Sequence, residues 1–289
     1  VEFILRSGDI DERRGQGGGV EAMLEGARIH RAIQGAAGSD YSAEVSMKEE
    51  ITLRDDLILT IEGRADGIIE QDGHTTIDEI KGMYTEVEQL EKPLEVHLAQ
   101  AKCYAYIWAK QNGLQEISVR MTYVGIANRH IRYFNEDYTF SELSEWFDGL
   151  AELYRPWAEY KADWEVRREG SIHSLEFPYD YRPGQKELAS DVYRTIYHGK
   201  KLFMEAPTGS GKTLATLFPG IKAMGVGLIS NIFYLTAKNI GAKAAADTLD
   251  LMRDGGLCLK SVQIIGKERA CINGAAPVKC NPEQCEYAK

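Results

Sequence analysis

The sequence predicts an α/β protein in two parts, and three observations lead to that prediction. Residues 57–80 alternate apolar and polar side chains on either side of Asp72-Gly73, which is typical of two strands joined by a tight turn. Residues 94–110 repeat apolar side chains with the period of a helix. Near residue 206 a short apolar stretch leads into a Gly-rich loop and another helical pattern. Strands and helices therefore mix along the whole chain.

Composition sets limits on size, partners and location. The chain has 289 residues, 44% of them hydrophobic and 27% charged, which is enough for two modest domains. A net charge of -10 argues against a generally basic surface that coats nucleic acid, but it leaves room for a local basic channel. No apolar run approaches the roughly 20 residues of a membrane span, and the N-terminus lacks a secretion signal. We expect a cytoplasmic protein without membrane contact.

The elements of the first part follow from periodicity. Helical patterns occupy residues 20–33, 94–110 and 141–168, whereas strand patterns occupy 41–53, 57–71, 75–80, 117–126 and 131–134. The order is strand, strand, helix, strand after the opening helix. The first residue is Val1 rather than Met, so we expect this sequence to be a fragment of a longer chain.

The hairpin brings two carboxylates together. Asp66 and Glu79 are expected on neighbouring strands near the same end of the hairpin, with Lys81 on the same face as Glu79 because side chains alternate along a strand. Two carboxylates about 4 Å apart repel by roughly 4 kcal/mol at an effective dielectric near 20. Such a pair is normally held by a cation or a shared proton, so the hairpin predicts a divalent metal site.

Four short blocks give this part of the chain a family resemblance. They are Gly26 with His30 (GARIH), residues 63–66 (GRAD), residues 79–81 (EIK), and Gln100 with Tyr104 (QAKCY). The spacing D-x(12)-E-x-K alone recurs in many hairpins, but the four blocks together, in this order, resemble the RecB-like group of PD-(D/E)XK nucleases. The resemblance covers about the first 170 residues and implies a restriction-endonuclease-like core.

The resemblance also implies roles for individual residues. His30, Asp66 and Glu79 would bind Mg²⁺ or Mn²⁺ with help from the Ile80 carbonyl, Lys81 would orient or deprotonate the attacking water, and Gln100 and Tyr104 would position DNA or steady the site. Physical chemistry is consistent with these roles. Carboxylate oxygens suit Mg²⁺, a bound metal lowers the pKa of its water, and a lysine beside a cation is pushed toward its neutral form.

A second part is expected to begin at residue 175, which divides the chain into domains 1–174 and 175–289. Residues 174–185 carry two prolines and a glycine between helical patterns, as linkers do. A helix is expected at 185–197 and a short buried strand at 201–205. The strand leads into a P-loop, in which Ala206 takes the place of the usual first glycine; its residues are Ala206, Pro207, Thr208, Gly209, Ser210, Gly211, Lys212 and Thr213.

The P-loop predicts ATP binding with Mg²⁺. Gly209 and Gly211 let backbone N–H groups converge on phosphate oxygens, and the helix that follows adds its positive N-terminus. Lys212 would reach the β and γ phosphates, and Thr213 would hold Mg²⁺. The loop by itself does not separate kinases, GTPases, transporters and helicases.

The surroundings of the P-loop resemble the first motor domain of the XPD/DinG superfamily 2 helicases, which makes that domain RecA-like but partial here. Residues 181–185 (YRPGQ) resemble their adenine-reading segment, with Gln185 as the reader, and residues 233–237 (FYLTA) resemble their motif Ia, a DNA contact. Residues 267–273 (KERACIN) resemble the start of their iron–sulfur insert. A further strand is expected at 261–265.

The cysteines depart from that family's pattern. Cys271, Cys280 and Cys285 would supply three ligands of a [4Fe-4S] cluster, and the fourth ligand, like the DEAH motif and the second motor domain, is expected beyond Lys289. Cys258 precedes a strand pattern and is interpreted as a buried or free thiol. Zinc is the alternative metal, although paired C-x(2)-C spacing is absent.

These resemblances imply a metal-dependent DNA nuclease coupled to an ATP-driven 5′-to-3′ helicase in DNA repair or processing, acting on DNA with single-stranded regions or ends. Two alternatives remain. The first part could be a nuclease-like module that only grips single-stranded DNA, or the second part could be another type of P-loop ATPase with a regulatory domain upstream. Without the DEAH motif and the second motor domain, negligible ATP hydrolysis is expected from this sequence.

Overall fold

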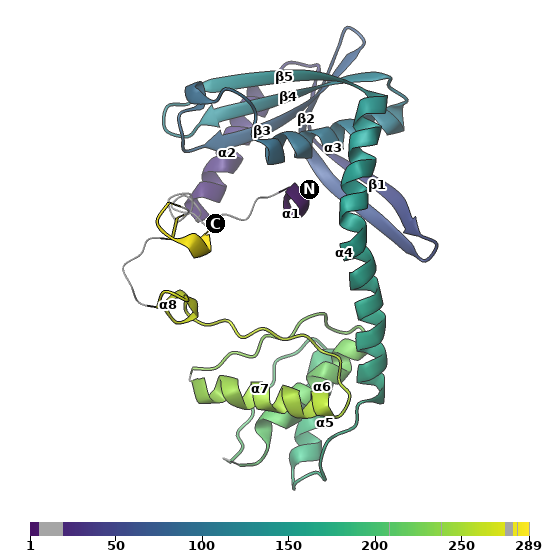
Figure 1. Ribbon diagram of the computed structural model, residues 1–289, viewed down its shortest axis with the longest axis vertical. Helices are drawn as coiled ribbons and strands as arrows, with labels where there is room; N and C mark the ends of the chain where they lie inside the picture. The colour runs from purple at the N-terminus through teal and green to yellow at the C-terminus, as the bar shows by residue number, and fades with distance from the viewer. Residues whose placement is uncertain (6–19, 208, 238, 275–279, 282, 289) are drawn as a thin grey trace. The chain divides into compact units, whose positions relative to one another are not determined.

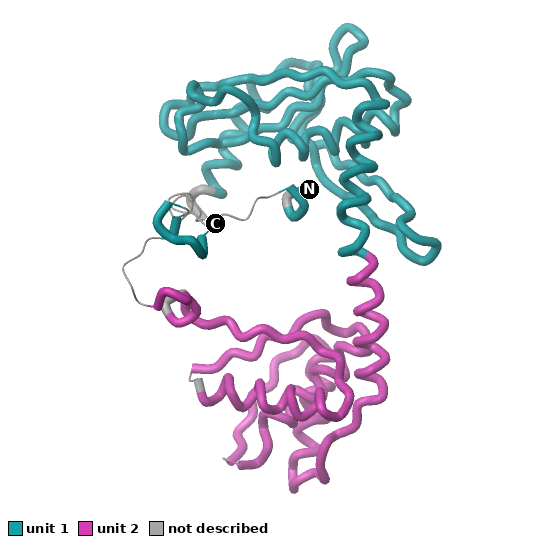
Figure 2. The backbone as a smooth tube through the Cα atoms, viewed as in Figure 1, with its two compact units in different colours: residues 1–158, 275–289 teal, residues 159–274 magenta. Residues whose placement is uncertain are grey.

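The structure is a computed structural model that describes residues 1–5, 20–207, 209–237, 239–274, 280–281 and 283–288. The chain forms two compact units, one made of Val1–Ala158 with Ala275–Lys289 and the other of Glu159–Gly274 (Figure 2). The predicted domain boundary at residue 175 stays a prediction. None of the helices in the described part of the chain is long and apolar enough to span a bilayer.

The first unit is built on a five-stranded sheet (Figure 1). Its strands are β1 (Tyr41–Arg54), β2 (Leu57–Gln71), β3 (His74–Met83), β4 (Glu116–Gly125) and β5 (Ile131–Thr139), in the spatial order of the sequence. Neighbouring strands are antiparallel except β3 and β4, which are parallel. A parallel pair needs a crossover connection, and α3 (Glu95–Asn112) supplies it. The mixed α/β fold confirms the predicted class and is consistent with a restriction-endonuclease-like core.

The core of this unit lies between the sheet and α3. Ala101, Ala105 and Ala109 are buried on α3, and their small side chains let the helix lie close to the strands. Tyr106 stacks on Phe147 of α4 (Phe140–Ser174), with ring centroids 4.0 Å apart. The short helix α1 (Glu2–Leu5) and the longer α2 (Val20–Ala36) complete the N-terminal part, and the 3-10 turn η2 (Val87–Gln89) precedes α3. The helices and strands predicted for residues 20–168 are therefore confirmed.

The second unit is helical around its core. Its helices are α5 (Gln185–Tyr197), α6 (Lys212–Gly225), α7 (Asn239–Asp254) and the short α8 (Lys267–Ala270). The 3-10 turn η3 (Glu286–Ala288) lies near the C-terminus and belongs to the first unit. Leu217, Ile221 and Met224 of α6 pack with Ile172 at the end of α4 and Met252 of α7. The helices expected at 185–197 and after the Gly-rich loop are confirmed.

Two predicted strands are wrong. Residues 201–205 and 261–265 form no strand, and they are exposed; Phe203 is 92% and Ile264 86% accessible. A strand needs a neighbour that satisfies its backbone N–H and C=O groups. Within the described residues, β1–β5 form the one sheet, and neither segment pairs with it. A RecA-like sheet is thus not shown by the second unit.

Candidate active site

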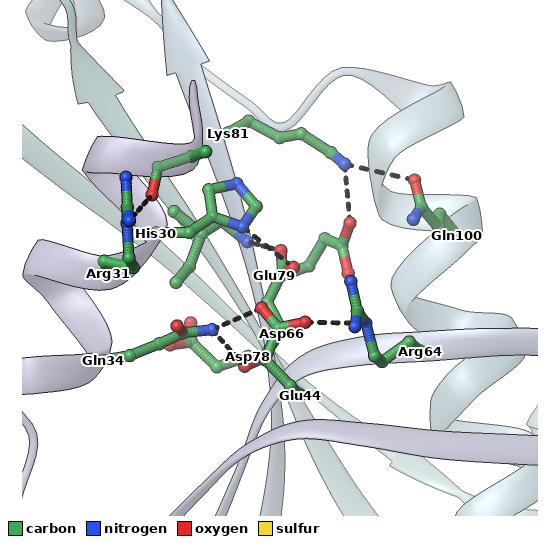
Figure 3. A network of polar contacts seen from close by, with 12 residues as sticks. His30, Arg31, Gln34, Glu44, Arg64, Asp66, Asp78, Glu79, Lys81 and Gln100 are labelled. Carbon is green, nitrogen blue, oxygen red and sulfur yellow. Dashed lines mark hydrogen bonds and ion pairs between the residues drawn. The ribbon is translucent and has the colours of Figure 1, made fainter. Parts of the chain in front are cut away.

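The β2–β3 hairpin sets the geometry of the site. Asp72 and Gly73 turn the chain with positive φ values of 52° and 78°, as expected of a tight two-residue connection. The last pair of the β2–β3 ladder is Gly67 with Asp78. Asp66 and Glu79 are the next residues away from the turn, so they lie side by side at the far end of the hairpin. The predicted juxtaposition of the two carboxylates is present (Figure 3).

Asp66 is held by contacts to both of its carboxylate oxygens. The Ile80 backbone N–H donates to Oδ2 over 2.7 Å, and His30 Nδ1 on α2 lies 3.1 Å from Oδ1. The hydrogen bond to Asp66 raises the pKa of His30, although burial opposes it. One helix and two strands therefore converge on this carboxylate.

Glu79 lies deeper than Asp66. The Lys81 ammonium donates to Glu79 Oε1 over 2.6 Å and to Gln100 Oε1 over 3.2 Å. Burial raises the pKa of Glu79 to about 7, and the nearby Lys81 only partly opposes that shift. The other oxygen, Oε2, is buried and has no hydrogen-bond partner. A buried acceptor without a donor is costly, and it marks a place where a cation or a proton belongs.

The α3 side of the site is also assembled as predicted. Gln100 Nε2 lies 3.3 Å from the Tyr104 hydroxyl, one helical turn further along. The Tyr104 ring packs directly on β2 at Gly63, where an added Cβ would lie 2.5 Å from the ring atom Cε1. Glycine is required there because any side chain would displace the tyrosine. Gln100 in turn contacts Lys81, so the helix and the hairpin form one polar network.

Two residues of this network had no place in the sequence-based prediction. Gln34 donates from Nε2 to Glu44 Oε1 and to the Asp66 backbone carbonyl, both over 2.9 Å. Gln34 lies one turn after His30 on α2, and that spacing is a usable signal. Glu44 is an ordinary polar position in the alternating pattern of β1, so periodicity does not distinguish it.

A divalent cation fits the residues present. One ligand atom each from His30, Glu44 and Asp66 lies within 4.8 Å of the others, and Glu79 adds a carboxylate oxygen that nothing else satisfies. Carboxylate oxygens and an imidazole nitrogen are suitable donors for Mn²⁺, and the oxygens suit Mg²⁺ as well. Ile80 contributes its amide to Asp66, and its side chain is fully buried.

Comparison with protein families identifies the superfamily of this chain. The family model described as PD-(D/E)XK nuclease superfamily matches residues 9–171, more than half of the chain. The chain belongs to the PD-(D/E)XK nuclease superfamily. No curated protein matches it. Among solved structures, this nuclease-superfamily chain is similar to the one titled "Crystal structure of SSO0001", at 20% identity and a TM-score of 0.34. That match covers 44% of this chain and 59% of the other, so this chain spans less than two thirds of it.

The P-loop residues lie in the second unit. Gly209 and Gly211 have φ values of 82° and 76°, and α6 begins at Lys212 directly after them. The Lys212 ammonium donates to the carbonyls of Ala206 and Pro207 over 2.8 and 2.6 Å. Thr208 lies outside the described residues, and Thr213 follows Lys212 on α6; Ser210 Oγ is buried without a partner.

Gln185 connects the predicted adenine-reading segment to this loop. It is buried at the start of α5, accepts from the Arg182 N–H over 3.0 Å, and donates to the Gly211 carbonyl over 3.3 Å. Gln185 and the loop are thus in direct contact within the second unit.

The cysteines are distributed over both units. Cys271 belongs to the second unit, whereas Cys280 and Cys285 belong to the first. Cys285 is buried, and Cys258, Cys271 and Cys280 are half-buried. The iron–sulfur cluster stays a prediction from the resemblance alone, and so does the interpretation of Cys258 as a free thiol.

Proposed function

We propose that the first unit is a RecB-like, metal-dependent DNA nuclease. The observation that carries the proposal is the buried Glu79 Oε2 without a hydrogen-bond partner, beside Asp66 and Lys81. A purely structural carboxylate would have donors on both oxygens, whereas a metal ligand keeps one oxygen for the cation. The nuclease superfamily itself implies binding of DNA and use of divalent ions.

In this proposal His30, Asp66, Glu79 and the Ile80 carbonyl hold Mg²⁺ or Mn²⁺. The bound ion would lower the pKa of its water and stabilise charge on the phosphate. Lys81, between Glu79 and Gln100, would orient the attacking water, and as the neutral amine it would accept the proton of that water. Gln100 and Tyr104 fix the lysine from α3 and contact the DNA backbone.

The test is cleavage of single-stranded and duplex DNA by the purified chain with Mn²⁺ or Mg²⁺. We expect cleavage by the parent and a loss of about 10³-fold or more in Asp66→Ala and Lys81→Ala, since each removes several kcal/mol of stabilisation from the reaction. Lys48→Ala is the matched control, because Lys48 is an exposed lysine on β1 that pairs only with carboxylates outside the site.

The alternative is a module that grips single-stranded DNA without cutting it. The polar network of the site would then be a structural remnant, and DNA affinity would survive Asp66→Ala unchanged. A parent protein that binds DNA but cuts neither substrate with either metal would replace the nuclease proposal by this one.

We further propose that the second unit binds ATP with Mg²⁺ and that the longer protein couples the nuclease to a 5′-to-3′ helicase of the XPD/DinG type with a [4Fe-4S] cluster. The support is the pair of left-handed glycines before Lys212 and the contact of Gln185 with the loop. Binding of a fluorescent ATP analogue is expected to need Lys212, with the exposed Lys200→Ala as control. If the analogue binds equally well to Lys212→Ala, the assignment of the nucleotide site to the P-loop is overturned.

A further inference from the structure

Glu44 on β1 brings a further carboxylate to the site. One of its oxygens lies with His30 and Asp66 in a group whose ligand atoms are all within 4.8 Å of one another. Ligands about 2.0–2.4 Å from a shared cation are separated by no more than about 4–5 Å. The three side chains can therefore share one ion through small side-chain adjustments, without movement of the strands that carry them.

A second observation points to a cation at the same place. Glu79 is 1% exposed, and its Oε2 has no hydrogen-bond partner. Its carboxylate interacts electrostatically with both Asp66 and His30, so it faces the same group of side chains. A buried oxygen without a donor thus lies next to the cluster of ligand atoms, and Glu79 could join the same cation through an adjustment of its side chain.

Glu44 has a partner on each carboxylate oxygen, and one of these partners can be replaced by a cation. Gln34 donates to Oε1 over 2.9 Å, and Arg64 Nε lies 2.6 Å from Oε2. The Arg64 side chain is 64% exposed, so its ion pair with Glu44 contributes little and is easily exchanged. Glu44 also has a positive φ of 57°, unusual for a residue within a strand. Arg64 thus balances the charge of Glu44.

We propose that Glu44 is a metal-binding residue of this site, in addition to His30, Asp66 and Glu79. The proposal rests on the nuclease function proposed above, since it concerns the same ion. Glu44 would add a third carboxylate, and each added hard oxygen ligand with negative charge strengthens binding of Mn²⁺ or Mg²⁺. On binding, the Glu44 carboxylate exchanges Arg64 for the ion, and the guanidinium becomes available to a phosphate.

The test is a titration of the purified chain with Mn²⁺ in the absence of DNA, followed by the electron paramagnetic resonance signal of the free ion. Glu44→Gln keeps the shape and the hydrogen bond from Gln34 but removes the charge, and we expect it to weaken Mn²⁺ binding about tenfold. The matched control is Glu50→Gln, also on β1, whose carboxylate is exposed and pairs with Lys48. The control is expected to bind Mn²⁺ as the parent does.

Each outcome decides something. Equal affinity in Glu44→Gln and the parent, with binding lost in Asp66→Asn, overturns the role of Glu44 and leaves the nuclease proposal intact. If the parent does not bind Mn²⁺, both the role of Glu44 and the nuclease proposal are overturned. If Glu44→Gln does not fold, Glu44→Asn decides, because asparagine tolerates a positive φ and also removes the charge; parent-like affinity in the folded Asn variant would likewise overturn the role.

Discussion

Asp78 and Glu79 are consecutive residues of β3, and the structure treats them in opposite ways. Because side chains alternate along a strand, they face opposite sides of the sheet. Asp78 is fully buried and receives hydrogen bonds from Arg120 over 2.8 and 3.0 Å, from Thr122 over 2.5 Å and from the Tyr41 hydroxyl over 3.1 Å. Both of its oxygens are satisfied by the chain itself.

Glu79 is equally buried but has a single donor, Lys81, on one oxygen. Two kinds of buried acid can therefore be distinguished by their hydrogen-bond donors. A carboxylate with a complete set of donors stabilises the fold, whereas one with an unsatisfied oxygen lowers stability and is retained for binding. Even the glycines of β2 follow this division: Gly67 makes room for Tyr41 beside Asp78, and Gly63 makes room for Tyr104 near Lys81.

The largest expected effect separates the two acids by activity. Glu79→Gln should lower Mn²⁺-dependent DNA cleavage by about 10³-fold, because the amide is a poor ligand and no longer pairs with Lys81. Asp78→Asn should change the cleavage rate of the folded protein by less than about tenfold. Rates are measured under single-turnover conditions at a temperature where circular dichroism shows both variants to be folded. Equal losses of cleavage rate in the two variants would contradict the distinction between a structural Asp78 and a metal-binding Glu79.

The next effect separates them by stability. Asp78→Asn should lower the free energy of unfolding by about 3 kcal/mol, since Arg120 keeps a largely buried charge without its partner. At pH 8, Glu79→Gln should be neutral or stabilising without metal, because it removes a buried charge with an incomplete set of hydrogen-bond donors. Urea unfolding with a chelator present measures both. Thr122→Val, which removes one donor to Asp78, should fall between them at about 1 kcal/mol.

Much of the first unit was predictable because its local signals agree with its tertiary packing. The Asp72-Gly73 turn fixes the hairpin register, and register alone puts Asp66 beside Glu79 and both on a face with Lys81. His30, Gln100 and Tyr104 came from the family resemblance, and the structure brings them to the same place. Their catalytic roles stay predictions until activity is measured.

The rest depends on contacts that periodicity does not encode. Glu44 joins the site because Gln34 and His30 of α2 contact Glu44 of β1 and Asp66 of β2. The packing of that helix against the strands is not encoded in the period of either element. The apolar run 201–205 looks like a buried strand because of its composition, yet strand formation requires a partner that the described residues do not provide. The composition of a segment can favour a strand, but whether the strand forms depends on a neighbouring strand elsewhere in the chain.

A further effect concerns pH and again distinguishes the two acids. The pKa of Glu79 is about 7 in the folded protein, above its usual value near 4.5. The folded state therefore binds the Glu79 proton more tightly than the unfolded state does. This contribution to stability is fully present below about pH 4.5 and is lost as pH rises through about 7. The pKa of His30 is also raised, so its contribution to the free energy of unfolding is likewise lost as pH rises above the usual pKa of histidine.

In the metal-free protein the free energy of unfolding should thus fall by on the order of 2 kcal/mol between pH 5 and pH 8 through these groups, since one pKa unit corresponds to about 1.4 kcal/mol. Glu79→Gln should remove most of that slope, and saturating Mn²⁺ at pH 8 should restore the parent's stability because the ion replaces the proton. Urea titrations at both pH values, with and without Mn²⁺, measure these changes. A slope that is equally steep in Glu79→Gln would mean that Glu79 is already ionised and paired at pH 5, and that its unsatisfied oxygen does not hold the proton.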